Sequence, residues 1–265
     1  VLLLFSGPYE RPDGLAAFLR RLGVPVELVD SGSDGGGAEH DVLSDSFFAD
    51  LLERVRSGAF FAIVAAPPCS TYSIARFFTP ANGETGAPVV RDRSHILGVE
   101  DVPAGHRNEL RRANEITRRT TVLLEAARRA GADFVIENPA DRGDPSIPWL
   151  FSTPEHGPIW LDPNMKALWR SCSLESATFA QCMFGAPVQK YTTFWFTPGF
   201  APHFRPLDRM LCSHPTGTHA AVAGGAKDDN GVWISTATAA YPADLNHYLA
   251  DSCQRLLGVR AAASP

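Results

Sequence analysis

The sequence predicts an α/β domain built on a mostly parallel sheet. Short apolar runs alternate along the chain with stretches in which apolar residues recur every three or four positions, the pattern of strands that alternate with helices. The runs contain few polar residues, as expected for parallel strands that are covered on both faces. They lie at residues 1–5, 24–29, 60–65 and 132–137.

Two helices are expected among the first three strands. The first should be capped by Asp13, a residue type that favours helix N-termini, and should end at Gly23. Apolar residues between Phe48 and Val55 indicate the second. Residues 71–106 then lack periodicity and are rich in Pro and Gly. Because an irregular stretch of this length is usually functional, we expect it to form a loop over a binding site.

The second half of the chain continues the alternation as far as residue 197. A long helix is predicted at residues 107–130, followed by strands at 177–183 and 191–197 with a short helix before them. The pattern breaks at residue 198, where Pro, Gly and His become frequent. The expected units are a core at 1–197, a small insert at 198–235 and a closing segment at 236–265 with a helix that packs back on the core.

Composition and charge restrict the class of protein. The chain has 265 residues, of which 45% are apolar, enough for one sizeable core. Its net charge of −5 argues against a broad nucleic-acid surface, although residues 71–120 hold eight Arg against six Asp or Glu. The five scattered cysteines favour a reducing, intracellular compartment. Since no apolar run approaches the roughly 20 residues of a membrane span, no membrane partner is expected.

Reactive side chains follow two of the predicted strands directly. The strand at 60–65 leads into Pro67-Pro68-Cys69-Ser70, and the strand at 132–137 ends in Glu137-Asn138-Pro139. Because the carboxyl ends of neighbouring parallel strands face one crevice, a thiol and a carboxyl group are expected to meet there. A cysteine after a strand is by itself usually a small buried apolar residue. Together, the two groups favour covalent chemistry with Cys69 as the nucleophile.

These motifs resemble those of cytosine-5 DNA methyltransferases, in particular the short, divergent branch found in phages and retroelement-like genes. Pro67-Pro68-Cys69-Ser70 is similar to the nucleophile motif and Glu137-Asn138 to the second catalytic motif. Phe5-Ser6-Gly7 resembles the glycine motif of the cofactor site, and Gly185 to Lys190 the glycine-proline-glutamine-arginine motif. The order and approximate spacing match over residues 1–195.

The resemblance implies a class I S-adenosylmethionine-dependent methyltransferase with a Rossmann-like fold, a reduced target-recognition region and DNA as substrate. Cys69 would be the nucleophile, Glu137 the partner of the cytosine ring nitrogen, and Asn138 the residue that positions the catalytic loop. The implied contacts to S-adenosylmethionine are Phe5, Ser6, Gly7, Asp30, Asp41, Val42 and Pro67. The implied contacts to nucleic acid are Ser70, Arg76, Arg91, Arg93, Gln189 and Lys190.

The chain also departs from the family pattern. The glycine motif continues as Pro8-Tyr9-Glu10 without further glycines, and the arginines expected after Gln189 are replaced by Lys190 and Thr192. Lysine cannot make the forked contact of arginine. The recognition region is short, so a protein partner could supply targeting. Two alternatives therefore stay open: an enzyme that acts on RNA or another pyrimidine, and a non-catalytic relative that binds nucleic acid.

A second group of residues lies in the predicted insert. Cys212, His214 and His219 are ligand types that suit zinc, with His203 upstream. The sequence around them contains no CxxC pair, so ordinary loop residues or polar groups that face DNA are the alternative. Cys172 and Cys182 are expected to be structural. The expected cofactors are thus S-adenosylmethionine and, from this cluster, zinc.

Overall fold

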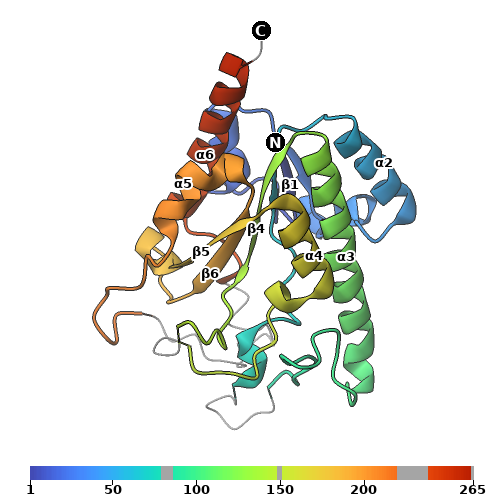
Figure 1. The fold of residues 1–265 in the computed structure, drawn as a ribbon, viewed down its shortest axis with the longest axis vertical. Helices are drawn as coiled ribbons and strands as arrows, with labels where there is room; N and C mark the ends of the chain where they lie inside the picture. The colour runs from blue at the N-terminus through green and yellow to red at the C-terminus, as the bar shows by residue number, and fades with distance from the viewer. Residues whose placement is uncertain (79–85, 148–150, 220–237, 264–265) are drawn as a thin grey trace.

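A computed structural model describes residues 1–78, 86–147, 151–219 and 238–263 of the chain. Six strands form one sheet in the order β2-β1-β3-β4-β6-β5 (Figure 1). The strands are β1 (Leu2–Leu4), β2 (Glu27–Val29), β3 (Ala62–Ala65), β4 (Asp133–Pro139), β5 (Glu175–Ala180) and β6 (Tyr191–Phe196).

The sheet is mostly parallel, which confirms the predicted α/β architecture. β1 pairs in parallel with β2 and β3, and β3 with β4, whereas β6 is antiparallel to both β4 and β5. The chain passes from β1 to β2 on one side and then to β3 on the other, so the strand order reverses at β1. Open α/β sheets bind ligands outside the carboxyl ends of the strands at such a reversal. The edge where β1, β3 and β4 end is therefore the expected site.

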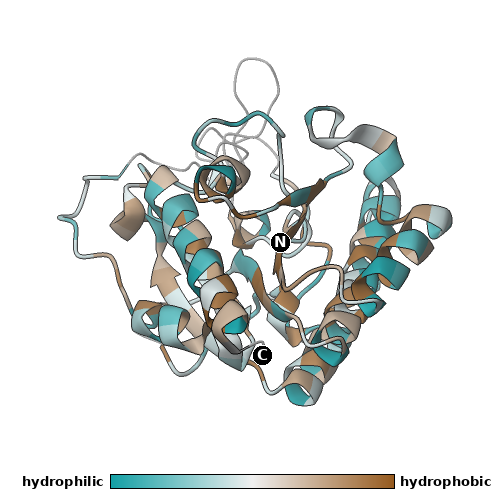
Figure 2. Cartoon of the chain, turned by 90° about the horizontal axis from the view of Figure 1, so that it is seen from above, coloured by the Kyte–Doolittle hydropathy of each residue, from teal (hydrophilic) through white to brown (hydrophobic). Residues whose placement is uncertain are grey.

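Helices cover both faces of the sheet, as Figure 1 shows. One face carries α2 (Asp45–Arg56), α3 (Arg107–Arg129) and α4 (Pro163–Cys172), and the other carries α1 (Leu15–Arg21), α5 (Ala201–Phe204) and α6 (Ala243–Ala263). Successive strand residues alternate between two buried clusters, Leu2 and Leu4 in one and Leu3 in the other. Figure 2 shows the apolar strands between helices whose outer faces are hydrophilic. Among the described helices, none combines the length and apolar character needed to cross a membrane.

The start of α1 differs from the prediction. Gly14, not Asp13, is the N-cap residue, and no side chain caps the helix. The Asp13 carboxylate instead accepts two hydrogen bonds from the Arg11 guanidinium, at 2.7 and 2.9 Å. This bidentate ion pair holds the carboxylate away from the helix N-terminus, so the predicted cap is wrong. Gly23 does follow the helix, with the left-handed φ of +72° that favours glycine at a helix end.

The predicted strand at 177–183 is too long. The chain leaves β5 after Ala180 and continues as a 3-10 helix, Gln181–Phe184, which ends at Gly185 with a φ of +83°. The left-handed turn redirects the chain toward β6. Residues 181 to 183 therefore lie at a corner of the sheet instead of within it.

The boundary predicted at residue 198 does not separate two hydrophobic cores. Phe200, Phe204 and Leu207 are at most 1% exposed and belong to the same cluster as the residues of α6. The start of the predicted insert is thus part of the core. Residues 220–235 of that insert lie outside the described part of the chain. The predicted closing helix is confirmed as α6.

Candidate active site

Cys69 lies on the loop that follows β3, at the carboxyl edge of the sheet. Its side chain is half-buried. Two hydrogen bonds brace this loop: the Asn138 side-chain amide donates to the Pro67 carbonyl at 2.8 Å, and the Tyr72 backbone N–H donates to the Cys69 carbonyl at 2.9 Å. Asn138, at the end of the neighbouring strand β4, is 1% exposed. The predicted nucleophile loop is thus tied to the strand end that carries the predicted carboxyl group.

Glu137 is buried at the end of β4 among hydroxyl donors. Its Oε1 accepts a hydrogen bond from Thr192 at 2.5 Å, and its Oε2 accepts one from Tyr241 at 3.0 Å. The Lys190 ammonium lies 3.7 Å from Oε1. The Gln181 amide donates to the Thr192 hydroxyl at 3.1 Å, which orients it. A carboxyl group that is 6% exposed is therefore held in a fixed orientation by three neighbours.

The charges around Cys69 shift the pKa of its thiol in opposite directions. Burial raises the pKa of the Cys69 thiol, the positive charge of Lys190 lowers it, and the negative charge of Glu137 raises it further. Burial also raises the pKa of Tyr241 well above its ordinary value, with Glu137 as the next cause. The Tyr241 hydroxyl is therefore a neutral donor at physiological pH. Cys69 is a thiol in this state, and additional positive charge in the crevice would favour the reactive thiolate.

The turn after β1 is tightly constrained. Phe5 and Gly7 both have a left-handed φ, +62° and +68°, and Phe5 is a residue type that rarely adopts it. The Ser6 hydroxyl donates to the Gly7 carbonyl at 3.2 Å. The Asp30 carboxylate, after β2, accepts hydrogen bonds from the backbone N–H groups of Gly7 at 2.9 Å and Gly32 at 2.7 Å. Asp30 therefore fixes the loop that the sequence predicts for the cofactor.

The Asp41-Val42 pair lies beside α3. Asp41 accepts a hydrogen bond from the Leu43 backbone N–H at 2.9 Å and pairs with Arg112 at 3.3 Å. Val42 is buried, and its carbonyl accepts a hydrogen bond from Arg119 at 3.1 Å. Two arginines of α3 thus anchor the loop that resembles the adenine-binding pair, Arg112 through an exposed ion pair and Arg119 through a backbone carbonyl.

A cavity of about 430 Å³ lies between the Cys69 loop and the first turns of α3. Pro68 and Ser70 line one side, and Arg112 and Ile116 of α3 line the other. Phe5, Asp30, Asp41 and Val42 are not among the lining residues. Asp41 and Val42 are connected to it nevertheless, because Arg112 pairs with Asp41, and Ile116 packs against the cluster that contains Val42.

Arg76 is engaged within the protein. Its guanidinium donates to the Ser70 carbonyl at 2.7 Å, to the Pro88 carbonyl at 2.9 Å and to Glu109 at 2.6 Å. The side chain is 7% exposed. Arg76 therefore links the Cys69 loop to α3. A contact between Arg76 and a phosphate would require these bonds to break.

The predicted contact between Arg91 and nucleic acid is wrong. The residue is 1% exposed, its guanidinium lies 3.7 Å from the centre of the Tyr72 ring, and it donates to Thr71 at 2.9 Å and to Asn114 at 3.0 Å. Its Nε is buried without a hydrogen-bond partner in the described part of the chain. A guanidinium in this position supports the Tyr72 ring and is not accessible to nucleic acid.

Arg93 has a similar internal role. One guanidinium nitrogen donates to both carboxylate oxygens of Asp141, at 2.9 and 3.0 Å, and the Arg93 backbone N–H donates to the Glu155 carbonyl at 2.9 Å. These contacts connect the irregular stretch before α3 to the loop after β4. Its side chain is 31% exposed, so a nucleic-acid contact remains sterically open there.

The remaining predicted contacts to nucleic acid flank the crevice. Ser70 and Gln189 are exposed, and Ser70 lines the cavity. Lys190 is half-buried and donates to the Thr238 carbonyl at 3.2 Å while it faces Glu137. Its charge is directed toward the carboxyl group of the site, so its position differs from that of a phosphate-binding residue on the surface.

The predicted metal-binding residues come together with a fourth residue. Cys212 Sγ lies 3.5 Å from His214 Nδ1 and 3.0 Å from His219 Nε2. Cys182 joins them: the ligand atoms of all four residues lie within 4.8 Å of one another. The sequence did not group Cys182 with this cluster; in the structure it is buried, and the corner after β5 directs its thiol at Cys212. Cys172 is buried in α4, as expected.

The sequence analysis did not predict two residues of the site, Tyr241 and Thr192. Tyr241 is separated from Glu137 by 104 positions, and the irregular sequence around it contains no signal for a site. Thr192 stands where the resemblance expects arginine, and that departure was its only signal. In the structure its hydroxyl donates to Glu137, so the departure contributes to the site.

The comparisons with known proteins do not assign the chain to a family. No protein-family model matches it, and a search of curated protein sequences returned no match. The function must therefore be argued from the site itself.

Proposed function

We propose that this chain transfers a methyl group from S-adenosylmethionine to carbon 5 of cytosine in DNA, through a covalent bond between Cys69 and carbon 6. One observation carries the proposal: Cys69 and Glu137 follow neighbouring parallel strands at the edge where the strand order reverses, and Asn138 ties the two strand ends together at 2.8 Å. A thiol and an oriented carboxyl group at one crevice are the two groups that this reaction requires.

Cys69 acts as the nucleophile. Carbon 5 of cytosine is weakly nucleophilic until a thiolate adds to carbon 6 and the ring electrons move toward carbon 5. Because burial raises the pKa of Cys69, the thiolate needs positive charge nearby, and Lys190 is one source. S-adenosylmethionine supplies an electrophilic methyl group on a positively charged sulfur. After transfer, a base removes the proton from carbon 5 and the thiolate leaves, which restores the aromatic ring.

Glu137 acts at the cytosine ring. Its carboxyl group, in the protonated form, donates a proton to ring nitrogen 3 as the thiolate adds, so that the ring does not accumulate negative charge, and takes that proton back as the thiolate leaves. Thr192 and Tyr241 hold the two carboxyl oxygens in place before the base arrives. General acid catalysis of this kind typically contributes a factor of about 10²–10⁴ in rate.

The residues at the carboxyl edge fit the cofactor. Asp30 already accepts two backbone hydrogen bonds, but a carboxylate has about four acceptor positions, which leaves capacity for ribose hydroxyls. The cavity of about 430 Å³ between Pro68 and α3, which Asp30 does not line, has both apolar and charged walls. Ligand sites commonly combine these features.

The substrate base must leave its stack to reach Cys69, because the thiol, on the loop at Pro67 to Ser70, is half-buried. The contacts we retain from the sequence are the exposed residues Ser70 and Gln189, with Arg93, whose side chain is 31% exposed. Arg91 is withdrawn from that set because it is buried.

A side-by-side assay tests the proposal. Purified chain is incubated with cofactor that carries a labelled methyl group and with duplex DNA, single-stranded DNA or RNA of the same sequence. We expect label in DNA, recovered as 5-methylcytosine after digestion. Transfer only to RNA would replace the proposed substrate, and binding without transfer to any of the three would favour the non-catalytic alternative.

A further inference from the structure

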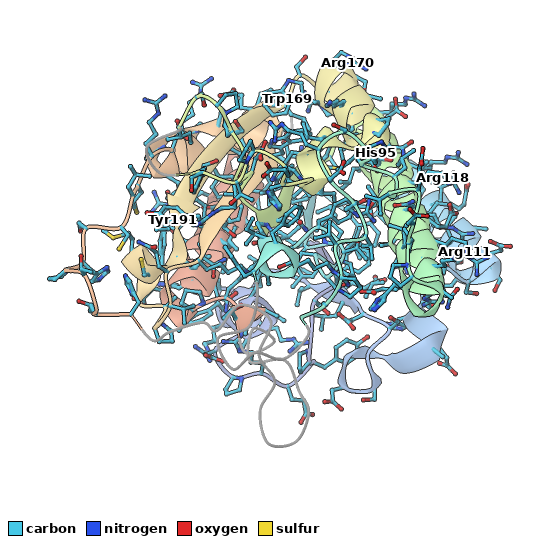
Figure 3. The ribbon with its side chains drawn as sticks, turned by 90° about the horizontal axis from the view of Figure 1, so that it is seen from below. His95, Arg111, Arg118, Trp169, Arg170 and Tyr191 are labelled. Atoms are coloured by element: carbon cyan, nitrogen blue, oxygen red, sulfur yellow. The ribbon has the colours of Figure 1, made fainter. Side chains whose placement is uncertain are left out.

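The corner after β5 brings together four side chains that the methyl-transfer chemistry does not use. Cys182 comes from the 3-10 helix after β5, and Cys212, His214 and His219 come from a segment about thirty positions further on. Their ligand atoms lie within 4.8 Å of one another. Figure 3 views this edge of the molecule, with sulfur atoms near the labelled Tyr191 and with Arg111 and Arg118 of α3 on the opposite flank.

We propose that Cys182, Cys212, His214 and His219 bind one structural zinc ion. Two thiolates and two imidazoles are a complete set for tetrahedral zinc, which leaves no open position for a reacting water. This inference is independent of the proposed methyl transfer.

The distances fit such a site. With zinc–sulfur bonds of about 2.3 Å and zinc–nitrogen bonds of about 2.0–2.1 Å, the ligands of a tetrahedral ion lie about 3.3–3.8 Å apart. The two recorded separations from Cys212 Sγ, 3.5 and 3.0 Å, lie close to that range. The imidazole rings of His214 and His219 are 5.0 Å apart between centroids and nearly perpendicular, so they do not stack. Small side-chain shifts suffice to close the site.

The local backbone shows what the metal would do. Within residues 212–219, the recorded backbone hydrogen bond joins Thr218 to Pro215, so it does not connect the segment to the sheet. The last backbone connection to β5 before the segment is the bond from Ala180 N–H to the Met210 carbonyl, at 2.9 Å. Beyond it, the Cys212 backbone contacts the Tyr191 hydroxyl of β6. A metal held by Cys182 on one side and by the three later ligands on the other would therefore fasten the rest of the segment to the corner of the sheet.

This corner is connected to the Glu137 side of the crevice. Cys182 adjoins Gln181, whose backbone N–H donates to the Lys190 carbonyl at 2.8 Å and whose side chain donates to Thr192 at 3.1 Å. Gln189 lies beside Cys212. The ion would thus fix the rim residue Gln189 and the segment 212–219 with respect to each other.

Metal analysis of the 265-residue chain tests the inference. The protein is produced in zinc-containing medium and purified under reducing conditions, and metal and protein are quantified together. We expect about one zinc ion per chain, because structural sites retain their metal through purification. The variants Cys182→Ser and Cys212→Ser should lose it, whereas Cys172→Ala and His203→Gln, a cysteine and a histidine outside the cluster, should keep it.

Cobalt substitution counts the thiolates. The cobalt-loaded wild-type protein should show a sulfur-to-cobalt charge-transfer band with the intensity of two thiolates per ion, and Cys182→Ser, which should not retain the metal, should not show it. His214→Gln changes an exposed residue and is expected to fold, so it provides a metal-binding test even if a cysteine variant does not. Full stoichiometry and affinity in Cys182→Ser would overturn the four-ligand site.

Hydrogen exchange locates the effect. Addition of zinc to the metal-free chain should slow exchange in residues 212–219 and leave α1 unchanged. Metal-free wild-type protein that takes up no zinc under reducing conditions would overturn the inference. Neither readout depends on methyl transfer, so an inactive enzyme with one bound zinc would contradict the proposed function alone.

Discussion

Cys69 and Cys212 are both half-buried, yet their surroundings shift the pKa values of the two thiols in opposite directions. Burial raises the pKa of Cys69, whereas the hydrogen bond with His219 is the main cause that lowers the pKa of Cys212 to about 6. The first thiol lies on a loop braced by backbone and buried amide contacts, and the second lies in a segment held mainly by side chains. A thiol's role is therefore set by its neighbours and by how the backbone around it is held.

The difference suits the two proposed tasks. A nucleophile that stays protonated until substrate and cofactor bind is protected from unwanted reactions, and its geometry must be fixed beforehand by the fold. A metal ligand needs the opposite, since deprotonation and final positioning accompany binding of the ion. Variants that disable either the Cys69 site or the proposed zinc site, and leave the other intact, would sharpen this comparison.

Among the variants of the Cys69 site, Glu137→Gln should have the largest effect on methyl transfer. The amide keeps the shape of the side chain but cannot donate the proton that ring nitrogen 3 requires. We expect methyl transfer to fall by about 10²–10⁴-fold, while cofactor affinity and metal content stay unchanged. Steady-state kinetics measures this, with Glu175→Gln, which changes an acidic residue at the start of β5 outside the site, as the matched control. Wild-type turnover in Glu137→Gln would remove Glu137 from the mechanism.

Asp30→Asn should weaken S-adenosylmethionine binding next most strongly. The substitution removes the charge that would accept ribose hydroxyls and that now holds the N–H groups of Gly7 and Gly32. A loss of about 1.5–3 kcal/mol in binding free energy is expected, as for hydrogen bonds to a charged group. Calorimetry measures the affinity, and thermal unfolding confirms that the variant is folded. Unchanged affinity would move the cofactor away from this turn.

Lys190→Met should have a smaller effect that appears in the pH dependence. Lys190 lowers the pKa of Cys69 against the effect of burial, so its loss should raise that pKa further. The thiolate is the reactive form and is present above the pKa, so the rise in reaction rate with pH should move to higher pH. Rates of Cys69 modification by a small alkylating reagent, measured across pH in both proteins, check this. A shift to lower pH would contradict the assigned charge interaction.

The sequence predicted the Cys69 site better than the proposed zinc site, for a physical reason. Apolar runs at 60–65 and 132–137 identify buried strands, and parallel pairing brings Cys69 and Glu137 to one edge without any knowledge of side-chain packing. Cys182 could not be placed in this way. Its position depends on the 3-10 helix Gln181–Phe184, which the apolar pattern of β5 conceals.

Arg91 and Tyr241 show that local sequence patterns do not predict contacts between distant segments. A local excess of arginine indicated a basic surface, but Arg91 stacks on Tyr72 in the interior, because burial depends on packing between segments far apart in the chain. Tyr241 reaches Glu137 from after the last strand, across a large sequence separation. Such contacts are set by the tertiary fold, and no local periodicity encodes them.

Covalent trapping tests the central claim most directly. Duplex DNA with 5-fluorocytosine at the target position cannot lose a proton from carbon 5, so the bond between Cys69 and carbon 6 should persist. The account predicts a stable protein–DNA adduct that requires S-adenosylmethionine, forms equally in Cys172→Ala and disappears in Cys69→Ala. An adduct that persists in Cys69→Ala, or a wild-type chain that methylates cytosine in DNA but never forms one, would contradict it.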